Sequence, residues 1–337
     1  MRVLRFVMAF AVVVAGVVST VGSGGGDNLS GPTGPVTPPP PIQPPWVDIT
    51  IANAQDVSAT IVQDADQVFD FAAMIGGQIF PSPPTAPNLL STNSKFELFE
   101  KTAATGAPAT DTCAVSGAVT VSGAPGNNPV SLSEEDTFDL VFETCDDGDG
   151  YSLDGSFSVI VNELAGDPRT DVFRLSYQLP NVIVTVAFDD GTHTMSSASR
   201  FSLTWDTVDF PVTVLSLTPN ALALSTQADN YVLLSGVHSR TINADISVST
   251  TLAEVGEAQL LSQVSLDGYI NYETVVPLQA PNGQAPESGE VLVSNGLANE
   301  TIRIVIESST SVRLEIDSDG DGTVNDTQYT TWAALLG

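Results

Sequence analysis

The chain has few basic residues. Lysine and arginine together account for 10 of its 337 residues, against 40 aspartates and glutamates, so the formal net charge is −30. A field of this sign repels the phosphate backbone of nucleic acids and anionic membrane surfaces. The composition therefore excludes nucleic acid as a partner and favours the binding of cations.

Cysteine is almost absent, since Cys113 and Cys145 are the only two. In a chain that reaches an oxidising compartment, such a lone pair is expected to form a disulfide. A simple hairpin with Cys113 opposite Cys145 would also place Val119 opposite Asp139, so that apolar and polar faces disagree by one residue. The sequence therefore predicts a Cys113–Cys145 disulfide, with either a bulge between the two strands or strands that are not neighbours.

Long apolar runs are missing except at the N-terminus. Arg2 and Arg5 precede an apolar stretch, 6–18, and small residues follow it, which is typical of an export signal over residues 1–22. The stretch is too short for a comfortable membrane span, and no later segment reaches transmembrane length. We therefore expect an exported protein, periplasmic or extracellular, with no transmembrane segment once the signal is removed.

Residues 23–45 are rich in glycine and then in proline, which predicts a disordered, semi-rigid spacer. The junction VGSGGGDN resembles the start of Gram-negative lipoproteins, which carry a cysteine just before such a glycine-rich tether. Ser23 stands at that position here, and a hydroxyl cannot take the thioether-linked lipid, so no lipid anchor is expected. As a whole the chain resembles uncharacterised, exported, lipoprotein-like β-rich proteins of Gram-negative bacteria, and this resemblance implies no particular activity.

The region 46–95 carries one helical pattern. Trp46–Ile51 alternates like a strand, and six apolar residues then recur at spacings of three and four. Asp56 is the expected N-cap and Gly76 the expected end. The pattern predicts an amphipathic helix that packs on the rest of the fold, with its apolar stripe formed by Val57, Ile61, Ala65, Val68, Ala72 and Ile75.

From residue 96 to residue 337, short alternating segments recur about every ten residues between Gly, Pro, Asn and Asp. The first is FELFE, Phe96–Glu100, and the last clear one is TIRIVI, Thr301–Ile306. This pattern predicts an all-β domain, built either as an antiparallel meander or as a β-sandwich.

An acidic stretch near the C-terminus makes the most specific chemical statement. Asp317, Asp319 and Asp321 alternate and Gly322 follows, which resembles the calcium loops of EF-hand, dockerin and thrombospondin type 3 repeats. The segments on either side alternate like strands, so the loop is expected to join strands. The resemblance implies a structural Ca²⁺ site, weak because glutamine replaces the usual last glutamate, with the ligands Asp317, Asp319, Asp321, Thr323, Asn325 and Gln328. The alternative is a solvated acidic turn.

The acidic stretch has an echo upstream. At an offset of 172 residues, Ser116-Gly117 falls on Ser288-Gly289, and 147–150 (Asp-Gly-Asp-Gly) falls on 319–322 with the same residues. A single ungapped offset predicts a duplicated hairpin unit, 116–159 and 288–331.

Catalytic signatures are lacking. His193 and His238 are the only histidines, and no nucleophile elbow, HExxH pair or glycine-rich phosphate loop accompanies them. Both are expected to be strand or turn residues. The sequence thus favours a non-enzymatic binding or structural module, with a glycan or an envelope protein as partner. The alternative is a secreted hydrolase, carbohydrate-active for example, which would need two carboxylates facing one cleft.

Overall fold

The computed structural model describes residues 46–79, 95–124, 133–148, 150–167, 172–188, 191–197, 201–209, 212–225, 230–243, 247–252, 256–261, 266–281 and 284–336. The chain divides into two units, Met1–Pro44 and Pro45–Gly337, and all described residues belong to the second. The predicted signal peptide (1–22), the spacer (23–45) and Ser23 lie outside the described residues.

Within the described residues the fold is all-β, as predicted, with nineteen strands in one sheet. The strands are β1 (Ala109–Thr112), β2 (Ser116–Ala124), β3 (Thr137–Asp146), β4 (Tyr151–Gly166), β5 (Phe173–Leu179), β6 (Ile183–Phe188), β7 (Gly191–Ser197), β8 (Phe201–Asp206), β9 (Val212–Thr218), β10 (Leu222–Ser225), β11 (Asn230–Ser235), β12 (His238–Asn243), β13 (Ser247–Thr251), β14 (Gly256–Leu261), β15 (Asp267–Pro281), β16 (Ser288–Ser294), β17 (Thr301–Ser308), β18 (Ser311–Asp317) and β19 (Asp326–Thr330). The helices are α1 (Ala54–Ile79), α2 (Phe96–Thr105) and α3 (Trp332–Leu336).

Of the two predicted arrangements, the structure shows the antiparallel meander. Two long strands, β4 and β15, each pair with two neighbours on the same side. Between them the chain alternates between two ranks of strands, a first rank of β5, β8, β9, β12 and β13 and a second rank of β6, β7, β10, β11 and β14. Each rank runs from β4 to β15 through antiparallel pairs, so the sheet is divided in its middle and continuous at both ends.

The chain breaks each meander strand where it crosses from one rank to the other. Pro180 and Asn181 (φ 57°) separate β5 from β6, Ala221 (φ 52°) precedes β10, and Gly236 (φ 108°) precedes β12. Proline cannot donate to the ladder, and a residue with positive φ turns the strand out of its plane. These local breaks let the two ranks diverge.

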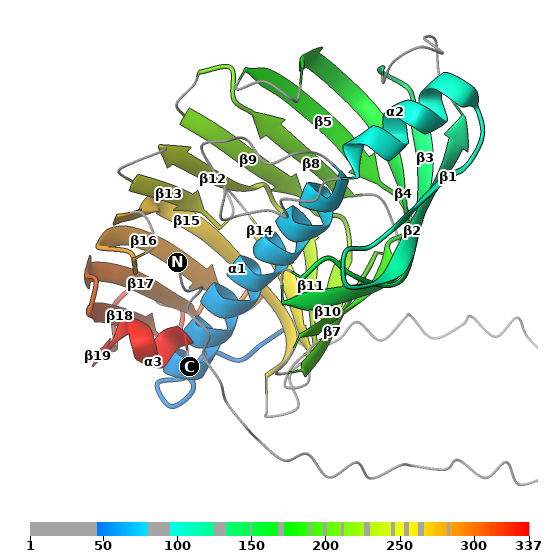
Figure 1. The fold of residues 1–337 in the computed structure, drawn as a ribbon. Coiled ribbons are helices and arrows are strands. Elements are labelled where there is room, and N and C mark those ends of the chain that lie inside the picture. Colours follow the sequence, from blue (N-terminus) through cyan, green and yellow to red (C-terminus); the bar gives the residue numbers. More distant parts are fainter. Residues whose placement is uncertain are drawn as a thin grey trace, which may run out of the picture. The chain divides into compact units, whose positions relative to one another are not determined.

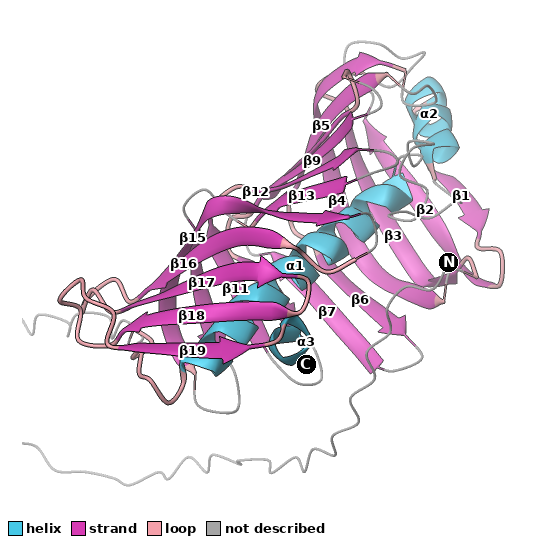
Figure 2. Ribbon diagram, turned by 90° about the vertical axis from the view of Figure 1, so that its left-hand side faces the viewer, coloured by secondary structure: helices cyan, strands magenta, loops and turns pink. Residues whose placement is uncertain are grey.

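Helix α1 fills the space between the ranks. The two ranks lie on opposite sides of α1 (Figures 1 and 2), and α3 packs against it near the C-terminus. The predicted stripe is confirmed, because all six of its residues are fully buried. The helix begins at Ala54, so Asp56 lies in its first turn instead of at the N-cap, and it continues past the predicted end, Gly76. Gly76 lies so close to Leu203 and the Tyr177 hydroxyl that a Cβ there would overlap both.

The prediction of a strand at Phe96–Glu100 is wrong, because this segment begins α2. Buried Leu98, Phe99, Thr102 and Ala103 follow a helical spacing, with the adjacent pair 98–99 breaking the alternation. Gly106 ends the helix in the left-handed conformation, and its N–H donates to the carbonyl of Thr102. Neither α2 nor any other described helix has the length and apolar character that crossing a bilayer requires.

Trp46–Ile51 is also not the predicted strand. Its single ladder contact is a parallel bridge between Trp46 and Tyr269, while Val47 and Ile49 point into the core. The alternation therefore reported burial correctly but not pairing.

The duplicated hairpin unit is not reproduced strand for strand. In 116–159, β2 pairs directly with β3, but in 288–331, β17 lies between β16 and β18. What does recur at the offset of 172 residues is an acidic turn that closes a hairpin, β3–β4 in one case and β18–β19 in the other.

Candidate functional site

The acidic loop joins β18 to β19 at one end of the sheet. Carboxylate oxygens of Asp317, Asp319 and Asp321 lie within 4.8 Å of one another, which is the convergence that a cation needs. Asp317 is the last residue of β18 and is 5% exposed, whereas Asp319 and Asp321 are exposed. The site therefore has one fixed and two adaptable carboxylates.

Backbone N–H groups hold the fixed carboxylate. Gly320 N donates to Oδ1 of Asp317 and Gly322 N to Oδ2, each at 2.8 Å. Burial by itself raises the pKa of Asp317, but these hydrogen bonds and those from Asp319 outweigh it, so the pKa lies below its ordinary value. The carboxylate is thus kept ionised, as a calcium ligand must be.

The other three predicted ligands are placed differently. Thr323 lies in the loop and its N–H donates to Asp321 at 2.7 Å. Asn325 Oδ1 accepts hydrogen bonds from the N–H and the hydroxyl of Ser318, so this side chain closes the loop. Gln328 lies two residues into β19, and its Nε2 donates to the carbonyl of Ile51 at 2.7 Å. We therefore remove Gln328 from the ligand set.

The disulfide between Cys113 and Cys145 is present, with 5.4 Å between the Cα atoms. Cys113 lies in the β1–β2 turn, where its N–H donates to the Gly117 carbonyl, and Cys145 lies near the end of β3.

A bulge resolves the register conflict noted in the sequence. Ser116 pairs with Asp146, but Ala118 pairs with Glu143, so β3 has one extra residue there. Thr144, with a φ of 46°, accommodates it. Beyond the bulge Val119 faces Phe142, and apolar residues again share one face.

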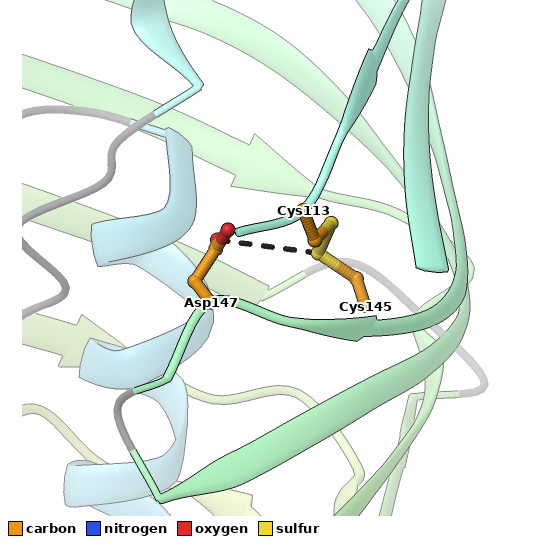
Figure 3. A group of neighbouring side chains, drawn as sticks. All are labelled: Cys113, Cys145 and Asp147. Atoms are coloured by element: carbon orange, nitrogen blue, oxygen red, sulfur yellow. Dashed lines mark hydrogen bonds between the residues drawn. A yellow bond between two sulfur atoms is a disulfide. The ribbon is translucent and has the colours of Figure 1, made fainter. Parts of the chain in front are cut away.

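A buried ion pair stands beside the disulfide. Lys95 Nζ lies 2.9 Å from Oδ2 of Asp147, and both side chains are less than 10% exposed. Oδ1 of Asp147 also accepts the N–H of Ala114 at 2.9 Å. The dashed line in Figure 3 joins Asp147 to Cys145 Sγ at 4.0 Å, but a disulfide sulfur carries no proton, so this is a packing contact. Because the two sulfurs bond each other, the Cys113, Cys145 and Asp147 group is not a metal site in this oxidised form. The sequence analysis missed this pair, and the rarity of lysine was its one signal.

The two histidines are packing residues, as predicted. The His193 ring stacks on Phe71 of α1 and meets Phe188 edge-on. His238 is 1% exposed, and its Nε2 lies 3.0 Å from the Tyr272 hydroxyl. Burial lowers the pKa of His238 to about 3 and raises that of Tyr272 well above its ordinary value, so both are neutral at physiological pH.

The neutral His238 should make the protein sensitive to acid. Below its ordinary pKa of 6.5 the unfolded chain takes up a proton that the folded chain refuses, so stability is present above that value and is lost as the pH falls towards 3. At pH 5 this single residue should cost about 2 kcal/mol of unfolding free energy relative to pH 7.5. Denaturant melts of the wild type and of His238→Gln at both pH values measure it, because the difference between the two proteins should change by that amount. His193→Gln is the matched control and should leave the pH dependence as in the wild type.

The end of the β3–β4 hairpin borders a shallow hollow of about 370 Å³. Tyr151 and Phe188, whose ring centroids are 5.9 Å apart, contribute to its lining together with Ser152 and Asp146. Asp146 is the one carboxylate among the described residues that line it. The hollow therefore offers aromatic surface with a few polar groups and lacks the carboxylate pair of a glycoside hydrolase.

The described chain thus shows an antiparallel sheet, a disulfide and a group of three aspartates that could hold a cation. Comparisons with protein-family models, with curated proteins and with solved structures found no match to this chain.

Proposed function

We propose that this chain is an exported, non-enzymatic binding or structural protein of the bacterial envelope or exterior that is stabilised by calcium. The observation that carries the proposal is the convergence of the Asp317, Asp319 and Asp321 carboxylates within 4.8 Å, at the spacing of calcium loops. The disulfide supports a compartment outside the cytoplasm. The likeness to exported lipoproteins, with Ser23 in place of the lipidated cysteine, belongs to the same proposal.

The proposed ligands are the three carboxylates and the carbonyl of Thr323, and water completes the shell. Extracellular calcium modules bind at dissociation constants of ~10⁻⁴ to 10⁻³ M, and the loss of Gln328 as a ligand places this loop at the weak end. The ion is therefore expected to be bound where calcium is millimolar and to act on stability.

Chelation should lower the melting temperature of the protein. Calcium at ten times its dissociation constant contributes about 1.4 kcal/mol by mass action, or roughly 3 °C for a domain of this size. Asp319→Ala should abolish the response to calcium, because it removes one exposed ligand without touching the hydrogen bonds of Asp317. Asp111→Ala, at an exposed aspartate of β1, is the matched control and should keep the response. A melting curve that ignores both chelator and millimolar calcium would leave only a solvated acidic turn.

The partner that we propose is a glycan or another envelope protein. The hollow supports a glycan, because the rings of Tyr151 and Phe188 offer apolar surface beside Ser152 and Asp146. A glycan binding screen with and without calcium, repeated with Tyr151→Ala, tests this. Binding that survives the substitution would place the glycan elsewhere.

A further inference from the structure

The segment through which the spacer enters the fold, Trp46–Ile51, is held largely by side chains of the last strands. The carbonyl of Val47 accepts a hydrogen bond from Nδ2 of Asn295 at 2.8 Å. The N–H of Ile49 donates to Oε2 of Glu300 at 2.8 Å. The attachment of this segment therefore depends on where Asn295 and Glu300 lie.

Both residues belong to the turn between β16 and β17. Nδ2 of Asn295 also donates to Oε2 of Glu300 at 3.2 Å, and the Asn295 side chain is buried. Its Oδ1 accepts the N–H groups of Leu297 and Ala298, at 2.9 and 3.3 Å. One amide thus sets the shape of the turn and holds Val47, so a change in the turn reaches the segment directly.

The acidic loop packs against the same turn. Gly320 has a φ of +70° and approaches the Ala298 carbonyl so closely that an added Cβ would overlap its oxygen. The N–H of Gly320 is held by the Asp317 carboxylate. Asp317 itself pairs with Thr301 at the start of β17. The contacts therefore run without a gap from the Asp317 carboxylate, through the turn, to the entry segment.

We propose that the acidic loop, 317–325, controls how firmly Trp46–Ile51 is attached to the fold. When the loop is ordered, Gly320 holds Ala298 in place, Asn295 keeps its position and the segment stays docked. When the loop opens, the turn relaxes and the entry segment is released. The part played by calcium, which would order the loop and strengthen the attachment of the spacer, rests on the proposed function; the coupling between loop and segment needs only the contacts above.

Two glycines of the loop provide a matched test in the full-length protein. Gly320 and Gly322 both have positive φ, at +70° and +85°, and both donate their N–H to Asp317. An added Cβ at Gly322, however, meets nothing within 4 Å. The two alanine variants therefore share the backbone strain and differ in the collision with Ala298.

The readout is hydrogen exchange at the N–H of Ile49. Gly320→Ala should speed this exchange by about tenfold or more, and Gly322→Ala by less than about threefold. Equal exchange in the two variants would overturn the coupling.

Calcium adds a second arm, with binding measured separately by calorimetry. At ten times its dissociation constant the ion should slow the exchange of the Ile49 N–H by roughly tenfold. Calcium that binds without slowing this exchange would also overturn the coupling. If calcium does not bind at all, the proposed function is wrong, and the two glycine variants still decide whether loop and segment are coupled.

Discussion

Replacing Cys113 and Cys145 by serine is expected to lower the free energy of unfolding by about 3 to 4 kcal/mol. The bond joins residues 32 positions apart and so closes a loop that contains β2 and most of β3. In the chain-entropy account, a cross-link of this span removes conformations mainly from the unfolded chain. The native ladder between β2 and β3 does not depend on the bond, so the fold should persist at lower stability.

Denaturant unfolding of the wild type and of the double serine variant measures the loss as a shift of the midpoint. Adding a reductant should shift the wild type by the same amount and leave the serine variant where it was, which is the internal control. A wild type whose midpoint is unchanged by reduction would show that the β2–β3 hairpin already restricts the unfolded chain.

Replacing Lys95 by methionine is expected to cost about 3 to 5 kcal/mol, because it leaves the buried carboxylate of Asp147 without its cation. The pair is 6% and 7% exposed, so water cannot take the place of the ammonium group. The loss should also loosen α2, because Lys95 immediately precedes that helix and Asp147 lies in the β3–β4 turn.

A double variant separates the cost of an unpaired charge from the worth of the pair. Lys95→Met combined with Asp147→Asn removes both charges, and the asparagine can still accept the N–H of Ala114. It should therefore recover most of the stability lost by Lys95→Met alone. Arg174→Met breaks the pair with Asp206, whose side chains are 48% and 29% exposed, and as the matched surface control it should cost at most about 1 kcal/mol. If Lys95→Met costs no more than this control, the pair is solvated in solution.

Much of the fold could be predicted because burial follows the period of the backbone. In β5, β8 and β9 the alternation of apolar residues matches the alternation of buried side chains. The apolar stripe from Val57 to Ile75 predicts α1 for the same reason. The prediction failed at Phe96–Glu100, where the alternation was imperfect and the helix-forming residues and Gly106 that followed decided for α2.

What the periodicity could not show is which strands become neighbours. The separation of the meander into two ranks depends on breaks such as Pro180-Asn181 and Gly236, each of which also reads as an ordinary turn in the sequence. The insertion of β17 between β16 and β18 likewise depends on pairing over distance, and an ungapped sequence offset cannot detect it.

The candidate site was determined by the sequence where its chemistry is local. Asp317, Asp319 and Asp321 converge because alternate residues of a tight loop share one side, and Gly322 provides the positive φ that the turn requires. The disulfide followed from the count of two cysteines. The tertiary structure alone decided the contacts between distant segments: Gln328 binds the carbonyl of Ile51, 277 residues away, and Lys95 meets Asp147. Such partners are chosen by the packing of whole elements, and no short stretch of sequence carries that information.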